Sequence, residues 1–568
     1  MSMPQQRRRS LRGVAVLLAT LIAVCSAGIG GAAPAQAARQ VPITGVGSSW
    51  SAIAIAAWVA QVKSTYQLDV SYEPSGSSNG RKQFAAGVPD FGVSEIPYGL
   101  VDNGQSDSSP RPYVYMPIVA GGTSFMYNLK IGGKRVTKLR LSGETIVKIF
   151  TGQITNWSDP AIKTDNPNLT LPARKIVVVV RSDGSGTTAQ FSTWMSKKYA
   201  SDWNAFCQKA GRSVNPCGVT SIYPTIPGMV AQAGSTGVAG YVQQSSAEGA
   251  ITYVEYGYAT NAGFPVVSLL NAAGYYVQPT ASNVAVGLLG AKINNDASNP
   301  ATYLTQILDG VYDNGDKRAY PLSSYSYMIL PTKTDTKFTT DKGYTLGKFG
   351  YYFLCQGQQN VERLGYSPLP INLVQAGFEQ LQKVPGVETQ SINIAGCNNP
   401  TFSSDGKNTI AEKAPQPEDC QQKGPTQCLA ATDAGAAGAT KGASRTAPGS
   451  TAKGANPTGT VRAGASPGST APGGSLIPGG AAPSVDPETG QTVTPAAPAG
   501  DGGDAQQAGG QQDALSGQPV SSVPVSLAAD AWGPGRTLLM SLAVLLLLGV
   551  ALAPPIIAHW SSARGRSR

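Results

Sequence analysis

The stretch Ile176–Thr188, IVVVVRSDGSGTT, joins a run of β-branched residues to a short polar loop rich in glycine and hydroxyl side chains. A helical pattern, Ala189 to Tyr199, follows directly. A strand, a tight loop and a helix in this order bring unpaired backbone N–H groups, hydroxyls and the positive end of a helix dipole to one point. The stretch therefore predicts an anion-binding loop in an α/β fold.

Three further loops have the same small, hydroxyl-rich character: Gly45–Trp50, Ser75–Gly80 and Asp90–Glu95. In open α/β folds ligands bind at the carboxyl ends of strands, so the four loops could line one cleft. Alternatively, each loop is an ordinary helix cap or turn, and Arg181 forms only a surface salt bridge with Asp183. No loop continues into the Gly-Lys-Ser/Thr of a Walker A motif, so nucleotide hydrolysis is not indicated.

Both ends of the 568-residue chain resemble targeting or membrane segments. Residues 1–37 combine an arginine-rich start, an apolar run and an A-x-A motif, as in a cleaved signal peptide. Alternatively, the segment is a lipoprotein signal, in which Cys25 would carry the lipid anchor. Residues 536–559 contain an apolar run of about 20 residues, long enough for a transmembrane helix. The basic tail 560–568 belongs in the cytoplasm by the positive-inside rule. We expect a single-pass cell-membrane protein whose N-terminal domain is extracellular.

The net charge of +10 resides almost wholly in those terminal segments. Eight arginines there, unaccompanied by acidic residues, leave +2 for residues 38–535, so nucleic-acid binding is not expected. Six cysteines remain after the signal peptide, and an even number favours disulfides in an exported protein. The pairs suggested by chain order are Cys207–Cys217, Cys355–Cys397 and Cys420–Cys428. A zinc site is the alternative, but no Cys-x-x-Cys occurs and the single histidine is His559.

Between the ends, residues 38–400 have the pattern of a globular domain and residues 401–535 that of a disordered linker rich in Gly, Ala, Pro, Ser and Thr. In the first part strand-like and helix-like runs alternate, and about 360 residues favour two lobes. Lobe one would combine about 43–115 with 265–400, and lobe two would be about 116–264. Among the strand-like runs are Tyr113–Val119, Ser124–Leu129, Val238–Val242 and Tyr325–Leu330.

A fifth segment, Ile149–Pro160 (IFTGQITNWSDP), lies between the third loop and the fourth. These five segments, in their order along the chain, resemble the phosphate-binding receptor of the bacterial phosphate ABC transporter. That family has a two-lobed type II periplasmic-binding-protein fold. The resemblance covers about residues 43–380. It implies a binding protein without a cofactor, not an enzyme, that closes over inorganic phosphate and delivers it to an ABC permease.

The resemblance also implies which residues bind phosphate. They are Ser49, Trp50, Ser77, Glu95, Arg181, Ser185, Gly186 and Thr187, with Asp183 supporting the arginine. Arg181 would supply the one full positive charge, and the other groups would offer hydroxyls and backbone N–H donors. An acidic acceptor would bind the proton that phosphate carries and would reject sulfate, which has none.

The chain departs from the family pattern at that acceptor, where aspartate is usual and Glu95 stands here. Ser49 and Trp50 similarly replace threonine and phenylalanine. Three outcomes are open: phosphate still binds, it binds weakly in a sensing or scavenging role, or the pocket takes another ligand. A surface scaffold or adhesin and a phosphatase-like enzyme are the alternative functions. Ser94 is either a helper hydroxyl in the site or part of a turn.

Overall fold

The computed structural model describes residues 40–102, 104–213, 215–299, 301–390, 395–403, 405–430 and 432–435, with two-residue strands β18 (Ser484–Val485) and β19 (Thr492–Val493) further on. The predicted signal peptide, most of the predicted linker, the C-terminal helix and the basic tail lie outside the described residues. Within the described ranges, no helix combines the length and the apolar character needed to cross a membrane. The signal peptide and the membrane span therefore stay predictions.

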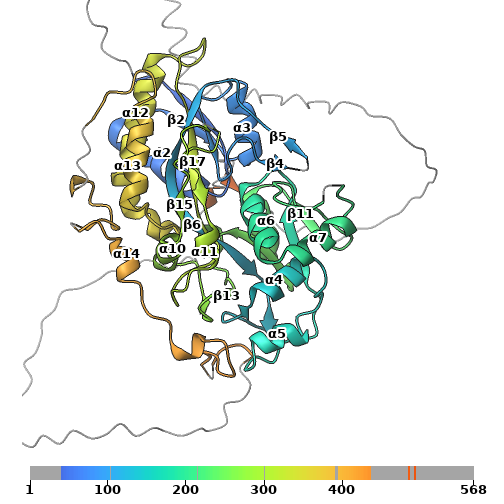
Figure 1. The fold of residues 1–568 in the computed structure, drawn as a ribbon. Helices are drawn as coiled ribbons and strands as arrows, with labels where there is room; N and C mark the ends of the chain where they lie inside the picture. The colour runs from blue at the N-terminus through green and yellow to red at the C-terminus, as the bar shows by residue number, and fades with distance from the viewer. Residues whose placement is uncertain are drawn as a thin grey trace, which may run out of the picture. The chain divides into compact units, whose positions relative to one another are not determined.

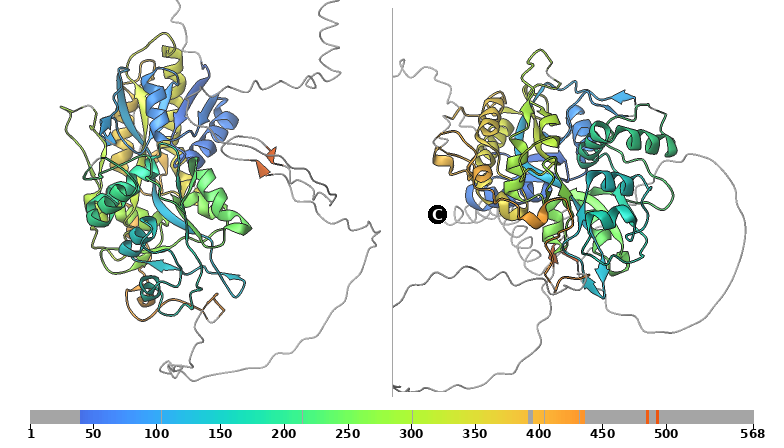
Figure 2. Two further views of the ribbon diagram at one scale, coloured as in Figure 1. Left: turned by 90° about the vertical axis from the view of Figure 1, so that its right-hand side faces the viewer. Right: turned by 60° about the horizontal axis from the view of Figure 1, so that its bottom comes forward.

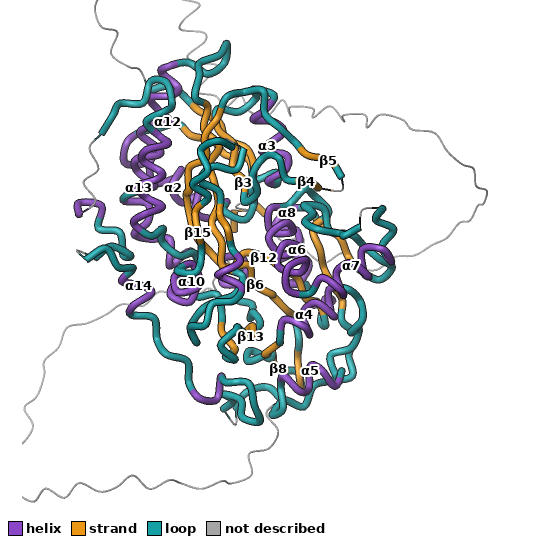
Figure 3. Tube along the Cα trace, viewed as in Figure 1, coloured by secondary structure: helices purple, strands orange, loops and turns teal. Residues whose placement is uncertain are grey.

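One mixed sheet of eight strands, in the order β11-β10-β12-β6-β17-β3-β1-β2, forms the centre of the described chain (Figure 1; Figure 3). Its strands are β1 (Ile43–Gly47), β2 (Val70–Glu73), β3 (Phe91–Ser94), β6 (Tyr113–Tyr127), β10 (Val177–Arg181), β11 (Val230–Gln232), β12 (Ala250–Glu255) and β17 (Ser323–Pro331). Strand β1 is parallel to β2 and β3, and β10 is parallel to β11 and β12. Strands β6 and β17 run antiparallel to their neighbours. The α/β fold is confirmed.

Helices cover the two halves of this sheet in separate groups (Figure 1; Figure 2). The α-helices are α2 (Ala52–Tyr66), α3 (Ser77–Ala85), α4 (Gly143–Phe150), α5 (Pro160–Asp165), α6 (Gly186–Lys198), α7 (Ala200–Lys209), α8 (Gly234–Gln243), α9 (Tyr256–Asn261), α10 (Ala281–Leu288), α11 (Asp309–Tyr312), α12 (Thr340–Leu354), α13 (Ile371–Leu381) and α14 (Thr409–Glu412). Helices α2, α3 and α12 contact β1, β2 or β3, whereas α6 and α8 contact β10 or β12. We call these halves the first and the second lobe.

Short strands and 3₁₀ turns complete the chain. The strands are β4 (Val101–Asp102), β5 (Gln105–Ser106), β7 (Lys130–Ile131), β8 (Lys134–Arg135), β9 (Arg140–Leu141), β13 (Ser268–Leu270), β14 (Tyr276–Val277), β15 (Lys292–Ile293) and β16 (Gln306–Ile307). The 3₁₀ turns are η1 (Ser245–Ala247), η2 (Gln356–Leu364), η3 (Ala395–Cys397) and η4 (Asp419–Gln421). Strands β4 and β5 form a hairpin of the first lobe whose Asp102 hydrogen-bonds to Ser221 of the second lobe.

Strand β6 belongs to both lobes. Its residues 113–122 pair with β17 and its residues 123–127 pair with β12. The sequence pattern predicts two separate strands here, Tyr113–Val119 and Ser124–Leu129; the structure instead has one strand of 15 residues. Glycine is needed for packing at this point, since a Cβ on Gly121 would lie 2.8 Å from the Trp50 ring. The strand therefore carries the chain from one lobe to the other without a break.

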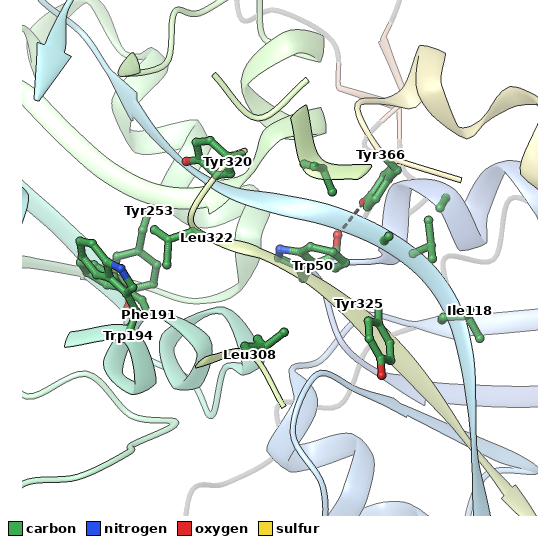
Figure 4. Packing of buried hydrophobic residues seen from close by; sticks show 14 of the residues in the cluster. Trp50, Ile118, Phe191, Trp194, Tyr253, Leu308, Tyr320, Leu322, Tyr325 and Tyr366 are labelled. Carbon is green, nitrogen blue, oxygen red and sulfur yellow. Dashed lines mark hydrogen bonds between the residues drawn. The ribbon is translucent and has the colours of Figure 1, made fainter. Parts of the chain in front are cut away.

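A continuous hydrophobic core runs through the junction of the lobes. Figure 4 shows its middle part, where Trp50 lies edge-on to Tyr366, with ring centroids 5.7 Å apart. The Tyr366 hydroxyl donates to the Trp50 carbonyl at 2.5 Å. In the second lobe, Phe191 and Tyr253 pack with centroids 5.2 Å apart. The loop after β1 is thus anchored by its tryptophan, and the neighbouring Ser49 hydroxyl faces Ser235 of the second lobe.

The described chain continues past the predicted domain boundary at residue 400. Helix α14 packs on α10, and Arg318 Nη1 donates to the Ala411 carbonyl at 3.0 Å. Arg140 Nη1 donates to the Cys420 carbonyl at 3.0 Å. The prediction of a disordered linker is therefore wrong for the described residues between 401 and 435. The composition of this segment does not indicate that it is ordered, because it has no long apolar run. Arginine–carbonyl hydrogen bonds and a disulfide hold it in place instead.

Two further predictions are decided by the fold. The three disulfides join Cys207 to Cys217, Cys355 to Cys397 and Cys420 to Cys428, as predicted. The strand predicted at Val238–Val242 is wrong, because these residues lie in α8. Val238, Ala239 and Val242 share one buried face of that helix. Such a short apolar run fits a helix and a strand equally well.

Candidate functional site

Loops from the two lobes meet beyond the carboxyl ends of the parallel strands. The Ser77 hydroxyl, at the start of α3, accepts a hydrogen bond from the Gly186 N–H, at the start of α6, at 3.1 Å. The hydroxyls of Ser49 and Ser235 lie 2.8 Å apart. These pairs are separated by 109 and 186 residues of chain. The structure thus brings into one place the loops that the sequence shows one at a time.

The loop after β10 forms the second lobe's part of the site. The Ser185 hydroxyl caps α6 by accepting from the Thr188 N–H at 3.2 Å. The Thr187 hydroxyl is buried and has no hydrogen-bond partner among the described residues. Gly186 approaches the first lobe so closely that a Cβ there would lie 2.0 Å from Glu95 Oε2. A helix N-terminus with an unpaired hydroxyl and no side chain on its first residue suits a small anion.

Arg181 supplies the positive charge at this loop and is 2% exposed. Its Nε donates to Asp183 Oδ1 at 2.7 Å, its Nη2 donates to Asp183 Oδ2, and its Nη1 donates to the Ser235 hydroxyl at 3.2 Å. Burial opposes ionisation of both partners, but their hydrogen bonds and opposite charges outweigh it. The pKa of Arg181 is therefore raised and the pKa of Asp183 is lowered. The pair is ionised, and Asp183 fixes the orientation of the guanidinium.

Glu95, directly after β3, is 1% exposed and accepts hydrogen bonds from three serine hydroxyls. Ser48 and Ser326 each donate to Oε1 at 2.5 Å. Ser77 donates to Oε2 at 2.7 Å. Because Oε2 also lies beside Gly186 of the second lobe, the carboxylate stands at the boundary between the lobes. Glu95 is therefore a fixed hydrogen-bond acceptor opposite the loop that leads from β10 into the first turn of α6, residues 182–187, which we call the anion loop.

Two other predicted positions have clear local roles. The Trp50 N–H donates to the Ser48 hydroxyl at 3.0 Å, so this N–H is already paired within its own loop. Ser94 takes the turn role of its two alternatives. Its hydroxyl donates to the Ile96 carbonyl at 2.7 Å and accepts from the Ile96 N–H at 3.1 Å. Ser94 shapes the backbone around Glu95 and does not face the second lobe's loop.

Three serines in the site were missed by sequence reasoning. Ser48 lies inside the loop Gly45–Trp50, so its position next to Ser49 was the available signal. Ser235 begins α8, and Ser326 lies in β17, 231 residues after Glu95. A serine within an apolar strand gives no local sign of which side chain it contacts. Only the sheet order, which puts β17 beside β3, brings Ser326 to the carboxylate.

A further contact between the lobes lies beside a cavity next to the site. Asp102 Oδ2, in the hairpin of β4 and β5, accepts from the Ser221 N–H at 2.7 Å and from its hydroxyl at 2.5 Å. Arg212 Nη2 lies 3.7 Å from Asp102 Oδ1. The Ser221 carbonyl in turn accepts from the Ser185 N–H at 2.8 Å. A cavity of about 510 Å³ opens among these side chains and Arg81. The hairpin thus contacts a residue that holds the anion loop.

Comparison with known proteins places this geometry in a family context. Residues 32–356 match the family model described as a PBP superfamily domain. The chain is 35% identical over 340 residues to the phosphate-binding protein PstS of Xylella fastidiosa strain Temecula1, covering 60% of this chain and 85% of that protein. It is 32% identical over 339 residues to PstS of Haemophilus influenzae, covering 59% and 91%. A solved high affinity periplasmic phosphate-binding protein bound with phosphate matches at 21% identity and a TM-score of 0.45, covering 59% of this chain and 92% of that one.

Proposed function

The chain belongs to the PstS family of phosphate-binding proteins in the PBP superfamily, and from this membership we propose that it binds inorganic phosphate between its lobes for uptake by an ABC transporter. The family comprises substrate-binding transport components, not enzymes. The relatives' names give the ligand class, and the chain's own residues give the means of binding it.

One observation carries the proposal: hydrogen bonds link an ionised arginine and a helix N-terminus of one lobe to the loops of the other lobe that bear a serine hydroxyl and an acidic acceptor. Arg181 and the loop Ser185–Thr187 come from the second lobe, and Glu95 comes from the first. Donors of the Arg181 and α6 kind bind oxyanions, because a helix N-terminus and a guanidinium both favour negative charge. An acceptor such as Glu95 repels an unprotonated oxyanion and accepts from a protonated one. Hydrogen phosphate satisfies both requirements.

Calorimetry on the full-length protein in detergent solution tests the proposal. Phosphate and arsenate both carry a proton near neutral pH, so each should bind at least about a hundredfold more tightly than sulfate, which has no proton for the acceptor direction of Glu95 Oε2 that Ser77 leaves unpaired. Absence of heat with phosphate would refute phosphate binding. The surface scaffold would then become the better hypothesis, since it needs the fold but not the ligand.

Transport and sensing are separated by a cellular measurement. Radiolabelled phosphate uptake should fall when the chain is deleted and should return with the wild-type gene but not with an Arg181→Met variant. Unchanged uptake in the deletion strain, together with phosphate binding in vitro, would favour a sensing role. The Arg181 variant serves here because it removes the guanidinium, and with it the positive charge, that the loop after β10 contributes to the site.

The predicted linker and C-terminal membrane helix also lead to a proposal about where the protein lies in the cell. We place the binding lobes outside the cell, joined to a membrane helix at 536–559 whose basic tail is cytoplasmic, on the sequence pattern alone. Protease added to intact cells should remove the lobes and leave a small membrane-embedded fragment that carries the C-terminus. A full-length chain that resists protease until the cells are lysed would contradict the orientation.

A further inference from the structure

Glu95 presents its two carboxylate oxygens to different surroundings. Oε1 faces the interior of the first lobe, where Ser48 and Ser326 both donate to it at 2.5 Å. Oε2 faces the second lobe, where it accepts from Ser77 at 2.7 Å and lies beside Gly186. A carboxylate has about four lone-pair sites, two on each oxygen. Oε1 is therefore saturated, and Oε2 keeps one acceptor direction.

The donor direction of Ser48 is fixed by its own neighbours. Its hydroxyl accepts from the N–H groups of Trp50, at 3.0 Å, and Ser51, at 3.4 Å, at the start of α2. A hydroxyl has one proton, and with two N–H donors pointing at its oxygen that proton is free to point only at Glu95. Ser48 therefore connects the N–H groups at the start of α2 to the Glu95 carboxylate: its oxygen accepts from them and its proton is donated to Oε1.

Ser326 and Ser77 also donate to the carboxylate. Among the described residues, the buried Ser326 hydroxyl has one hydrogen-bond partner, which is Glu95. The Ser77 hydroxyl accepts from the Gly186 N–H at 3.1 Å, so its proton also goes to the carboxylate. Ser48 and Ser77, whose oxygens already accept from N–H groups, can therefore only donate to Glu95, and Ser326 donates to the same carboxylate.

We propose that Ser48 and Ser326 are positioning residues that hold Glu95 as a pure acceptor and leave Oε2 to recognise the proton of a protonated tetrahedral oxyanion. The inference rests on the proposed phosphate-binding function and assigns selectivity within it.

The test uses Ser326→Ala, Ser48→Ala and the double variant, with Ser324→Ala as the matched control. Ser324 lies two residues before Ser326 in the same strand, is 2% exposed, and its hydroxyl has no hydrogen-bond partner among the described residues. Its truncation therefore removes a buried serine hydroxyl without touching Glu95. Phosphate and sulfate dissociation constants are measured by calorimetry on the full-length protein at equal ionic strength.

Each single variant should lower the ratio of phosphate to sulfate affinity by about tenfold, as expected for loss of one hydrogen bond to a charged group, and the double variant should lower it further. Ser324→Ala should leave the ratio unchanged, and Ser326→Thr, which keeps the hydroxyl, should restore it. An unchanged ratio in the double variant, with phosphate still bound, would overturn the inference and leave the proposed function standing. Wild-type protein that does not bind phosphate would instead overturn the proposed function.

A double-mutant cycle separates positioning from a general packing effect. If Ser326 acts through Glu95, Ser326→Ala should have no further effect on selectivity once Glu95→Gln is present. Equal effects of Ser326→Ala in both backgrounds would show that the serine acts independently of the carboxylate, and the inference would be wrong. Thermal unfolding of each variant confirms that the compared proteins are folded.

Discussion

Glu95 and Glu255 are glutamates of nearly equal burial, 1% and 0% exposed, at the ends of strands β3 and β12 in opposite lobes. Three serine hydroxyls donate to Glu95. Glu255, the N-cap of α9, accepts from the Gly257 N–H at Oε2, at 2.6 Å. Its Oε1 has no partner among the described residues, and the neighbouring Tyr366 hydroxyl donates to the Trp50 carbonyl instead.

The difference shows that burial alone does not decide what a carboxylate does. Burial raises the pKa of Glu255 well above the usual range, because the donors near it, chiefly the Gly257 N–H, do not replace the lost hydration of a charged group. Glu255 therefore works as a helix cap inside the lobe junction. Glu95 has the donors that a buried acceptor needs and faces the opposite lobe. The number and origin of the donors thus distinguish a ligand-facing carboxylate from a structural one.

Among single substitutions, Glu95→Gln should have the largest effect on binding. The amide offers one acceptor oxygen to three hydroxyl donors and adds two protons of its own, so at least one buried group loses its partner. We expect phosphate affinity to fall at least about a hundredfold and discrimination against sulfate to be lost. Glu255→Gln is the matched control and should change phosphate affinity less than threefold. Equal losses of phosphate affinity in both variants would show that Glu95 does not differ from Glu255 in its role in binding.

Gly186→Ala tests whether the space next to Glu95 belongs to the site. A Cβ there would lie 2.0 Å from Glu95 Oε2 and 2.5 Å from the Ser77 hydroxyl, so the two lobes would be held apart. Overpacking of this kind costs about 1–3 kcal/mol, which predicts a loss of phosphate affinity of about tenfold to a hundredfold. Gly240→Ala, in α8 of the same lobe, is the control, because a Cβ there meets nothing within 4 Å. Similar affinities of the two variants would show that the lobes need not approach at Gly186.

The loops of the site could be predicted because each is encoded locally. In Ile176–Thr188 the strand, the polar turn and the helix start follow one another within the 13 residues, and backbone N–H groups at such a junction need no distant partner to be recognised. The same holds for the loops after β1 and β3. Their assembly into one site follows from the general rule that parallel strands present their carboxyl ends together.

Features that depend on sheet order could not be predicted in this way. Ser326 contacts Glu95 only because β17 is inserted between β3 and β6. The unbroken course of β6 through Gly121 depends on the Trp50 ring, which comes from a different loop. The helix at Val238–Val242 depends on packing against β10 and β12. In each case the deciding neighbour lies far away in the chain.

Glu255→Gln should affect stability and not binding. A carboxyl whose pKa is raised on folding binds more protons in the folded than in the unfolded state, so wild-type stability falls as the pH rises above the ordinary glutamate value of about 4.3. The neutral amide removes this contribution. We expect the two proteins to unfold at similar urea concentrations near pH 4.5, and the variant to be more stable by about 1–2 kcal/mol at pH 7. A constant difference across this range would show that Glu255 does not titrate between the two states.

Asp102→Asn extends the comparison to a carboxylate that contacts the other lobe from the hairpin and whose side chain is 24% exposed. Asp102 accepts from Ser221 across the lobes, whereas Asp107, in the same region, binds Arg81 Nε of its own lobe at 2.7 Å. Because exposed charge contacts contribute about 1 kcal/mol or less, Asp102→Asn should weaken phosphate binding only about threefold, and less at high salt. Asp107→Asn should leave the affinity unchanged, since it joins no residues of opposite lobes. Equal effects of the two variants would show that the hairpin does not help to hold the lobes together, and that the donors around Glu95 and the anion loop suffice for closure.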